Sequence, residues 1–363
     1  MSGDPVLLTP GPLTTAASTK EAMLHDWGSR DGRFIGMNRK VREGLLELAG
    51  VAGSHVCVPV QGSGTFAVEA MLGTLVPRDG RVLVLVNGAY GRRMASICRI
   101  IGRAFSVYET PEEQPPDPGE VGRLLRGDPS LTHVACVHCE TTTGLLNPLA
   151  AVAEVVERHG RRLLVDAMSA FGALPVDGIS FDAMAASSNK CLEGVPGMGF
   201  VLCRREVLAA SGGNAHSLAL DLHDQWTAMD ANGQWRFTPP THVIAALAHA
   251  LDLLAEEGGV AARGGRYRRN WRLLVDGMRA MGFETLLPDA AQAPIIVTFR
   301  MPSGFPFERF HDSLRAKGYV IYPGKLTGAD SFRIGCIGAI GEVEIRGVLE
   351  AVRETLMELE AGR

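Results

Sequence analysis

The chain has 363 residues, of which 46% are hydrophobic and 21% charged, so it can bury a large core and is not a disordered protein. Its formal net charge of −4 argues against nucleic acid as the main partner. No apolar run approaches the ~18 residues of a membrane span, and the N-terminus has no signal-peptide pattern. Seven irregularly spaced cysteines favour a reducing compartment. We therefore expect a cytoplasmic protein that binds neither membranes nor nucleic acid.

Short apolar runs alternate with helical patterns along the first 260 residues, which is typical of a parallel sheet covered by helices on both faces. Strands are expected at Val56–Val60, Val82–Val86, His133–His138, Leu163–Val165, Ala183–Ser187 and Gly199–Cys203. Helices are expected at Phe66–Leu75, Pro148–Gly160 and Thr241–Gly259. The polar segment Pro111–Glu120 is interpreted as a solvated connector.

After about residue 261 the pattern changes. A basic helical segment, Arg263–Leu274, precedes expected strands at Pro294–Phe299, Tyr319–Gly324 and Phe332–Gly338, with helices near Arg309–Lys317 and from Glu342. We predict an α/β protein with a large domain over residues 1–260 and a smaller α+β domain over residues 261–363. The basic segment carries too few aromatic residues for nucleic-acid binding, so we interpret it as a solvated helix face.

Polar residues that follow three of the strands suggest a ligand site. Gly62-Ser63-Gly64-Thr65 opens a helix, where unpaired N–H groups and two hydroxyls suit a phosphate, although an ordinary glycine turn is the alternative. Asp166 ends one strand and Lys190 follows the next, so both side chains can reach the carboxyl edge of the sheet. Small, uncharged neighbours around Lys190 predict lost solvation, a lowered pKa and a nucleophilic amine.

A phosphate cradle, a strand-end acid and a lysine together match the needs of pyridoxal phosphate, and Tyr90 is placed to stack on its ring. No metal site is expected. Cys136 and Cys139 lie three residues apart on a strand, point to opposite faces and are interpreted as core cysteines.

A series of motifs in one order resembles the fold-type I aminotransferases of the alanine–glyoxylate and serine–pyruvate branch. The motifs are LLTPGPLTT (Leu7–Thr15), QGSGTFAVEAML (Gln61–Leu72), NGAYGRRM (Asn87–Met94), VHCETTTGLLNP (Val137–Pro148), VDAMSAFG (Val165–Gly172), SSNKCLEGVPG (Ser187–Gly197), WRFTPPTH (Trp235–His242), IYPGK (Ile321–Lys325) and FRIGCIG (Phe332–Gly338). The resemblance implies a fold-type I transferase with a mostly parallel sheet and a smaller C-terminal domain. It also implies pyridoxal 5'-phosphate as cofactor and a homodimer with shared active sites.

The resemblance assigns roles to individual residues. Lys190 matches the lysine that binds the cofactor's aldehyde, and Asp166 the acid that pairs with the ring nitrogen. The other positions similar to cofactor-binding residues are Ser63, Gly64, Thr65 and Asn189 for the phosphate, Tyr90 for the ring face, Thr141 or Thr143 for the ring hydroxyl, and Thr238 for the phosphate of the other subunit.

On the substrate side, Arg333 resembles the arginine that clamps a carboxylate, and Gly11 and Pro12 lie in the N-terminal loop expected beside that pocket. The alternative interpretation is that Arg333 forms an ion pair with an acidic residue of the protein itself. The segment His25–Phe34 departs from the family pattern, and in it Arg30 and Arg33 are expected to contact a phosphonate unless the loop is merely solvated.

Within this branch the motifs are most similar to members that use 2-aminoethylphosphonate, so we expect transfer of its amino group to pyruvate, giving phosphonoacetaldehyde and L-alanine. Alanine–glyoxylate or serine–pyruvate exchange with another amine donor is the alternative. A sulfur-removing lyase of the same fold would need a mobile cysteine, for which Cys336 and Cys191 are the candidates, and neither lies in an evident flexible loop. A cofactor-binding regulator would need a DNA-binding domain that the sequence does not show.

Overall fold

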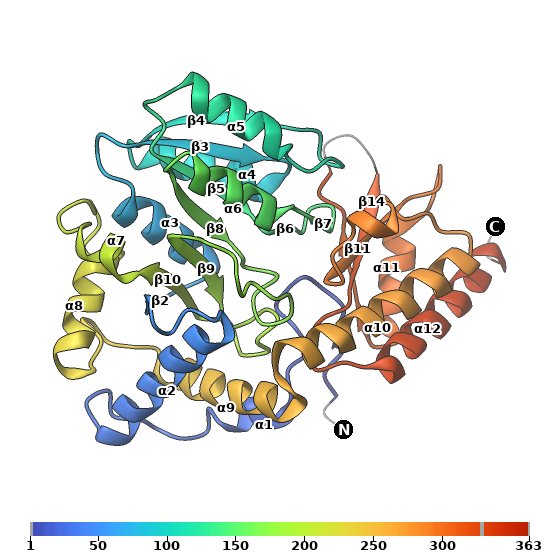
Figure 1. Cartoon of the computed structure of the whole chain (residues 1–363). Coiled ribbons are helices and arrows are strands. Elements are labelled where there is room, and N and C mark those ends of the chain that lie inside the picture. Colours follow the sequence, from blue (N-terminus) through green and yellow to red (C-terminus); the bar gives the residue numbers. More distant parts are fainter. Residues whose placement is uncertain (1–2, 327–329, 362–363) are drawn as a thin grey trace.

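The largest layer of the computed structural model, which describes residues 3–326 and 330–361, is a seven-stranded sheet with helices on both faces (Figure 1). In spatial order its strands are β2 (His55–Gln61), β10 (Met198–Arg204), β9 (Ala183–Ser187), β8 (Arg162–Asp166), β5 (His133–Val137), β3 (Arg81–Val86) and β4 (Ala104–Glu109). Each strand expected before residue 260 is present. The strand expected at Tyr319–Gly324 is instead two short strands, Tyr319–Val320 and Tyr322–Pro323, which belong to different sheets. The sheet is mostly parallel, as predicted, but β10 runs antiparallel to both β9 and β2.

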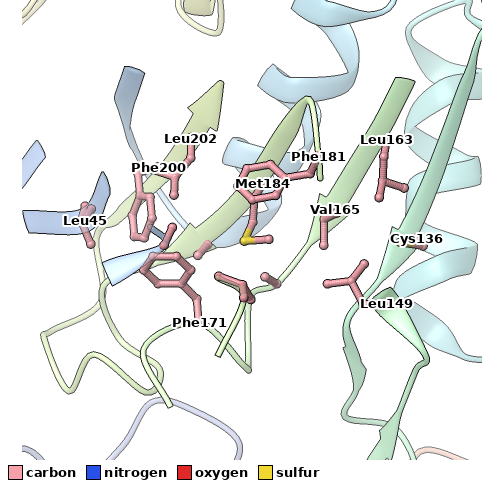
Figure 2. Close-up of a cluster of buried hydrophobic side chains, with 14 of the residues drawn as sticks. Leu45, Cys136, Leu149, Leu163, Val165, Phe171, Phe181, Met184, Phe200 and Leu202 are labelled. Atoms are coloured by element: carbon pink, nitrogen blue, oxygen red, sulfur yellow. The ribbon is translucent and has the colours of Figure 1, made fainter. Parts of the chain in front are cut away.

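Two layers of helices bury the faces of this sheet. One face is covered by α2 (Gly32–Leu48), α5 (Pro118–Gly127), α6 (Leu149–Arg158) and α9 (Thr241–Glu257). The other is covered by α3 (Gly64–Leu75), α4 (Ala89–Ile100), α7 (Arg205–Ala209) and α8 (Leu222–Asn232). Figure 2 shows part of the first core, where Phe171, Met184 and Phe200 lie close together against the strands. Burial on both faces explains why the strands are continuous apolar runs.

Two local expectations need correction. Strand β4 was not predicted, because it is an edge strand whose residues are largely exposed or half-buried and it lacks a continuous apolar run. Helix α5 begins at Pro118, inside the segment interpreted as a connector. Asp117 caps it by accepting a hydrogen bond from the Gly119 N–H, and proline in the first turn needs no N–H partner.

The C-terminal part of the chain forms a second layer around a three-stranded sheet (Figure 1). The sheet order is β11 (Ile296–Arg300), β14 (Ser331–Gly335) and β13 (Tyr322–Pro323), and the helices are α10 (Gly259–Ala280), α11 (Phe307–Ala316) and α12 (Glu342–Ala361). The N-terminal strand β1 (Val6–Leu7) pairs in parallel with β12 (Tyr319–Val320), so the start of the chain packs against its C-terminal part. Shorter elements are α1 (Ala17–Glu21), β6 (Cys139–Glu140), β7 (Leu145–Leu146) and the 3-10 helix η1 (Asp289–Ala291).

We propose the domain division near residue 260, which falls in the first turn of α10. Helix α9 ends at Gly258, whose φ of 108° is favourable for glycine alone, and α10 starts at the next residue. The strand β1 crosses the division, because it belongs by sequence to the large domain and pairs with β12. No helix in the described ranges is long and apolar enough to cross a membrane.

The interpretation of the basic segment as a solvated helix face is wrong for two of its arginines. Arg263 is 1% exposed and Arg266 is half-buried, and each forms ion pairs with Glu193 and Glu257. Tyr267, which donates a hydrogen bond to Glu193, is fully buried. A charge is tolerated in a protein interior when a partner of opposite charge meets it there. One of these partners, Glu193, lies about 70 residues away in sequence.

Candidate active site

The carboxyl edge of the large sheet brings together the residues singled out in the sequence. Asp166 is the last residue of β8, and Lys190 lies in the loop after the neighbouring strand β9. Gly62 and Ser63 join β2 to α3, and Tyr90 lies in the first turn of α4, directly after β3. Parallel strands present their carboxyl ends on one edge, so these four connections share it.

The Lys190 side chain is partly buried against the N-terminal loop. Its Nζ donates a hydrogen bond to the Pro10 carbonyl oxygen at 2.5 Å. A Cβ atom at Gly11 would lie 2.5 Å from the same Nζ, and Gly11 has a φ of 118°, so only glycine fits beside the amine. Burial lowers the pKa of Lys190 to about 8, and the positive charges of Lys325 and Arg333 act in the same direction. The lowered pKa agrees with the sequence-based expectation.

Asp166 is buried at the edge of the sheet with one oxygen engaged. Its Oδ1 accepts a hydrogen bond from the Met168 N–H at 3.0 Å. Burial raises the pKa of Asp166 to about 6, against the opposing effects of this hydrogen bond and of the charges of Arg93 and Lys190. A cation placed beside the carboxylate would restore its charged form.

In the phosphate cradle predicted at Gly62–Thr65, no hydrogen bond among the described residues involves the Ser63 hydroxyl. Ser63 is the N-cap of α3, yet its side chain makes no capping hydrogen bond, and the first N–H groups of a helix have no partner within the helix. A Cβ atom at Gly64 would clash with the Met168 side chain, two residues beyond Asp166. The cradle therefore lies against the segment that carries the acid, with donors available for an anion.

Arg93 is a residue of this region that the sequence analysis did not identify. Its guanidinium donates to the Thr65 hydroxyl at 3.1 Å and lies over the Tyr90 ring, 4.8 Å from the ring centre. It thus adds a positive charge to the cradle and supports the aromatic ring from one side. The only signal in the sequence is its spacing three residues after Tyr90 on a helix, which places both on one face.

Glu140 is a second residue that the sequence analysis missed. It is fully buried, and its carboxylate accepts hydrogen bonds from the Thr142 N–H, the Thr142 hydroxyl and the Tyr90 N–H at 3.2, 2.5 and 3.2 Å. Burial raises the pKa of Glu140, against the effect of these bonds. No ion pair among the described residues involves Glu140. One carboxylate therefore ties the turn after β6 to the start of α4, where Tyr90 lies.

The turn after β6 also contains the two threonines predicted near the ring hydroxyl. The Thr143 hydroxyl is engaged within the turn, donating to the Glu140 carbonyl oxygen and accepting from the Leu145 N–H. No hydrogen bond among the described residues involves the hydroxyl of Thr141, although its carbonyl oxygen is used. Both side chains are buried.

Arg333 lies on β14 and is 1% exposed. Its Nη1 donates to the Thr141 carbonyl oxygen at 2.9 Å and its Nε to the Pro323 carbonyl oxygen at 3.2 Å. Within the described ranges Arg333 has no ion pair, so the alternative of an internal salt bridge is not what the structure has. Burial lowers the pKa of the Arg333 guanidinium, and a carboxylate arriving as substrate would supply the missing negative charge.

The remaining residues predicted for the active site lie at its periphery. Asn189 is half-buried beside Lys190, and Pro12 accepts a hydrogen bond from the Thr9 hydroxyl through its carbonyl oxygen. Thr238 is exposed and lines a cavity of about 660 Å³ together with Gly62. Arg30 is exposed in the segment before α2, without a hydrogen bond to another predicted site residue in the described chain.

These residues fit pyridoxal phosphate. This cofactor requires an amine, an acid and an anion site. The lysine with a lowered pKa, the buried Asp166 carboxylate and the start of α3, whose N-cap hydroxyl makes no capping hydrogen bond, supply these three groups. Fold and site together are those of a pyridoxal-phosphate-dependent transferase of fold type I.

Comparison with known proteins narrows this class. The sequence pattern of the aminotransferase class-V family matches residues 21–328. A protein named 2-aminoethylphosphonate–pyruvate transaminase from Pseudomonas putida KT2440 is 57% identical over 99% of this chain and 99% of its own length. A protein named 2-aminoethylphosphonate–pyruvate transaminase 2 from Burkholderia lata is 55% identical over 98% of this chain and 96% of its own length. A ureidoglycine–glyoxylate aminotransferase from Bacillus subtilis superposes with a TM-score of 0.90 at 25% identity, over 98% of this chain and 93% of that one. The chain belongs to the class-V aminotransferases, and its cofactor is pyridoxal 5'-phosphate.

Proposed function

We propose that this enzyme transfers the amino group of 2-aminoethylphosphonate to pyruvate, giving phosphonoacetaldehyde and L-alanine. The observation that carries the substrate assignment is the 57% identity, along 99% of both chains, to a relative named for this reaction. The buried, unpaired Arg333 agrees with it, because pyruvate brings the carboxylate that this guanidinium lacks.

Lys190 is proposed to transfer protons, and Asp166 to stabilise the charge of the cofactor ring. When bound, pyridoxal phosphate supplies an aldehyde for the amine and a ring that stores electrons. Lys190, with a lowered pKa, is the base that would take the proton from the substrate carbon bearing nitrogen and deliver it to the carbon of the cofactor's aldehyde group. Asp166 holds a positive charge at the ring nitrogen, which in turn keeps the carboxylate ionised in its buried site.

The other residues orient the reactants. Ser63, Gly64 and Thr65 hold the phosphate with help from Asn189, and Tyr90 covers the ring, backed by Arg93. Of the two threonine candidates for the ring hydroxyl, the structure favours Thr141, because the Thr143 hydroxyl is engaged in its own turn.

On the substrate side, Arg333 binds the carboxylate of pyruvate, and Gly11 and Pro12 form the wall beside Lys190. We propose that Arg30 contacts the phosphonate group of the amine donor.

We also propose that the enzyme is a homodimer in which Thr238 of one subunit reaches the cofactor phosphate of the other. The cavity that Thr238 lines also contains Gly62, at the mouth of the cradle. Phe66 and Phe237, which line it too, are 49% and 47% exposed in the single chain. Large aromatic side chains exposed around one cavity are a feature of protein interfaces, and this one adjoins the site.

The enzyme is proposed to be cytoplasmic. All seven cysteines are free and buried, which suits a reducing compartment. Burial raises the pKa of the Cys191 and Cys336 thiols, the two candidates for a sulfur-removing lyase, and a thiol kept protonated is a poor nucleophile.

The test uses purified enzyme loaded with pyridoxal phosphate, 2-aminoethylphosphonate and pyruvate, with alanine as the measured product. The competing pairs are L-serine or L-aspartate with pyruvate, measured as alanine, and L-alanine with glyoxylate, measured as glycine. We expect the highest kcat/KM with 2-aminoethylphosphonate. A higher value for L-serine or L-aspartate, or a higher kcat/KM for glyoxylate than for pyruvate as acceptor, would refute the substrate assignment while leaving the transamination chemistry in place.

A further inference from the structure

The loop that carries Lys190 contains an unusual backbone conformation. Glu193 has a φ of 59°, and among the described residues other than glycine it is the one with a positive φ. The left-handed region is unfavourable for a glutamate, so its surroundings must hold it there. Its N–H donates to the Lys190 carbonyl oxygen at 2.8 Å, which closes a tight turn on the lysine.

A buried cluster from helix α10 holds the Glu193 side chain. Its carboxylate accepts from the Tyr267 hydroxyl at 2.5 Å and from Arg266 Nη2 at 2.8 Å, and lies 3.5 Å from Arg263 Nη1. Arg263 also donates to the Cys191 carbonyl oxygen at 2.8 Å, next to the lysine. Glu193 is 7% exposed and Tyr267 fully buried, so these contacts are shielded from water.

The same helix residues hold the segment that follows β14. Arg266 Nη1 donates to the carbonyl oxygens of Gly338 and Ile340 at 2.6 and 2.8 Å, and the Tyr267 oxygen accepts from the Gly338 N–H at 3.2 Å. Strand β14 carries Arg333, and it ends only three residues before Gly338. Helix α10 therefore contacts both the lysine loop and the segment that directly follows the arginine strand.

We propose that Glu193, through Arg263, Arg266 and Tyr267, is a positioning residue that fixes the Lys190 loop relative to the strand of Arg333. This inference rests on the proposed function, because it treats Lys190 and Arg333 as the two points between which a carboxylate-bearing substrate is held. A substrate anchored at both points reacts fast only when their separation matches its length. Glu193 touches neither the substrate nor the cofactor.

The test compares two amines that react with the lysine-bound cofactor of the intact holoenzyme. L-alanine carries a carboxylate for Arg333, whereas hydroxylamine carries none. The ratio of their second-order rate constants, followed by the absorbance of the cofactor, measures the benefit of anchoring and is insensitive to a loss of folded protein. The variants are Glu193→Gln and Tyr267→Phe. The matched control is Asp289→Asn, which also removes a carboxylate paired with two arginines of α10, Arg272 and Arg279, without contacting the lysine loop.

We expect the alanine-to-hydroxylamine ratio to fall about tenfold in Glu193→Gln and Tyr267→Phe and to stay unchanged in Asp289→Asn. If Glu193→Gln does not fold, Tyr267→Phe decides, because it keeps the ring and the carboxylate. A folded variant with the wild-type ratio, even with a lower melting temperature, would show that the cluster only stabilises the fold. Wild-type enzyme that reacts with hydroxylamine but not with L-alanine would instead contradict the proposed function, and the ratio is then measured with the amino acid that it accepts.

Discussion

Replacement of Lys190 by methionine tests the electrostatics of the site directly. The pKa of this amine falls from 10.5 to about 8 on folding, so the cofactor-free protein is destabilised when the lysine is charged. The shift corresponds to about 3 kcal/mol at most, and to less where the partly exposed amine keeps some water. Methionine has a similar length and no charge, but it forfeits the hydrogen bond to the Pro10 carbonyl oxygen, worth about 1 kcal/mol.

The sign of the effect depends on pH. Below pH 8 the lysine is protonated in both states and its full cost is present, so Lys190→Met is expected to be more stable than wild type by about 2 kcal/mol at pH 7. Between pH 8 and 10.5 the folded protein holds the neutral amine while the unfolded chain still binds the proton, so wild-type stability rises relative to the variant. Above pH 10.5 the variant is expected to be less stable by about 1 kcal/mol, the value of the lost hydrogen bond.

Urea unfolding of the cofactor-free proteins between pH 7 and 11 measures this difference. Other groups that titrate in this range are common to both proteins and cancel. Lys40→Met, which removes an exposed lysine paired with Asp252, controls for the loss of a lysine in general. A difference in unfolding free energy between wild type and Lys190→Met that does not change with pH would refute the argument that burial lowers the pKa of this amine.

Three further substitutions follow from the contacts of the site. Arg333→Gln is expected to lower kcat/KM for pyruvate about 100-fold or more, with an unchanged cofactor spectrum; an unaffected KM and kcat would remove Arg333 from the substrate site. Asp166→Asn is expected to lower kcat about 100-fold or more in steady-state assays, because the ring nitrogen loses its partner, and near-normal turnover would contradict this role. Glu140→Gln places an amide N–H against the Tyr90 N–H, so chemical denaturation should show a loss of about 1–3 kcal/mol together with a higher KM for pyruvate. Wild-type stability would mean that the Tyr90 N–H bond to Glu140 does not stabilise the fold.

Much of the fold is readable from the sequence because its signals are local. Continuous apolar strands and alternating helices predict a mostly parallel sheet buried on both faces, and the strands are present where they were expected. Strand ends and glycine turns place Asp166, Lys190 and the cradle on one edge, since parallel strands always present their carboxyl ends together. The antiparallel direction of β10 was not readable, because a buried strand shows the same apolar run in either direction.

The contacts between distant segments were decided only by the tertiary structure. Arg263 and Arg266 look like solvent-exposed charges in a basic helix, and only tertiary folding brings the distant Glu193 to them. Glu140 likewise shows no periodicity that marks it, and it becomes important because the turn after β6 meets the start of α4. A sequence pattern records what each residue prefers locally, whereas the burial and partner of a charge depend on which remote segments pack around it.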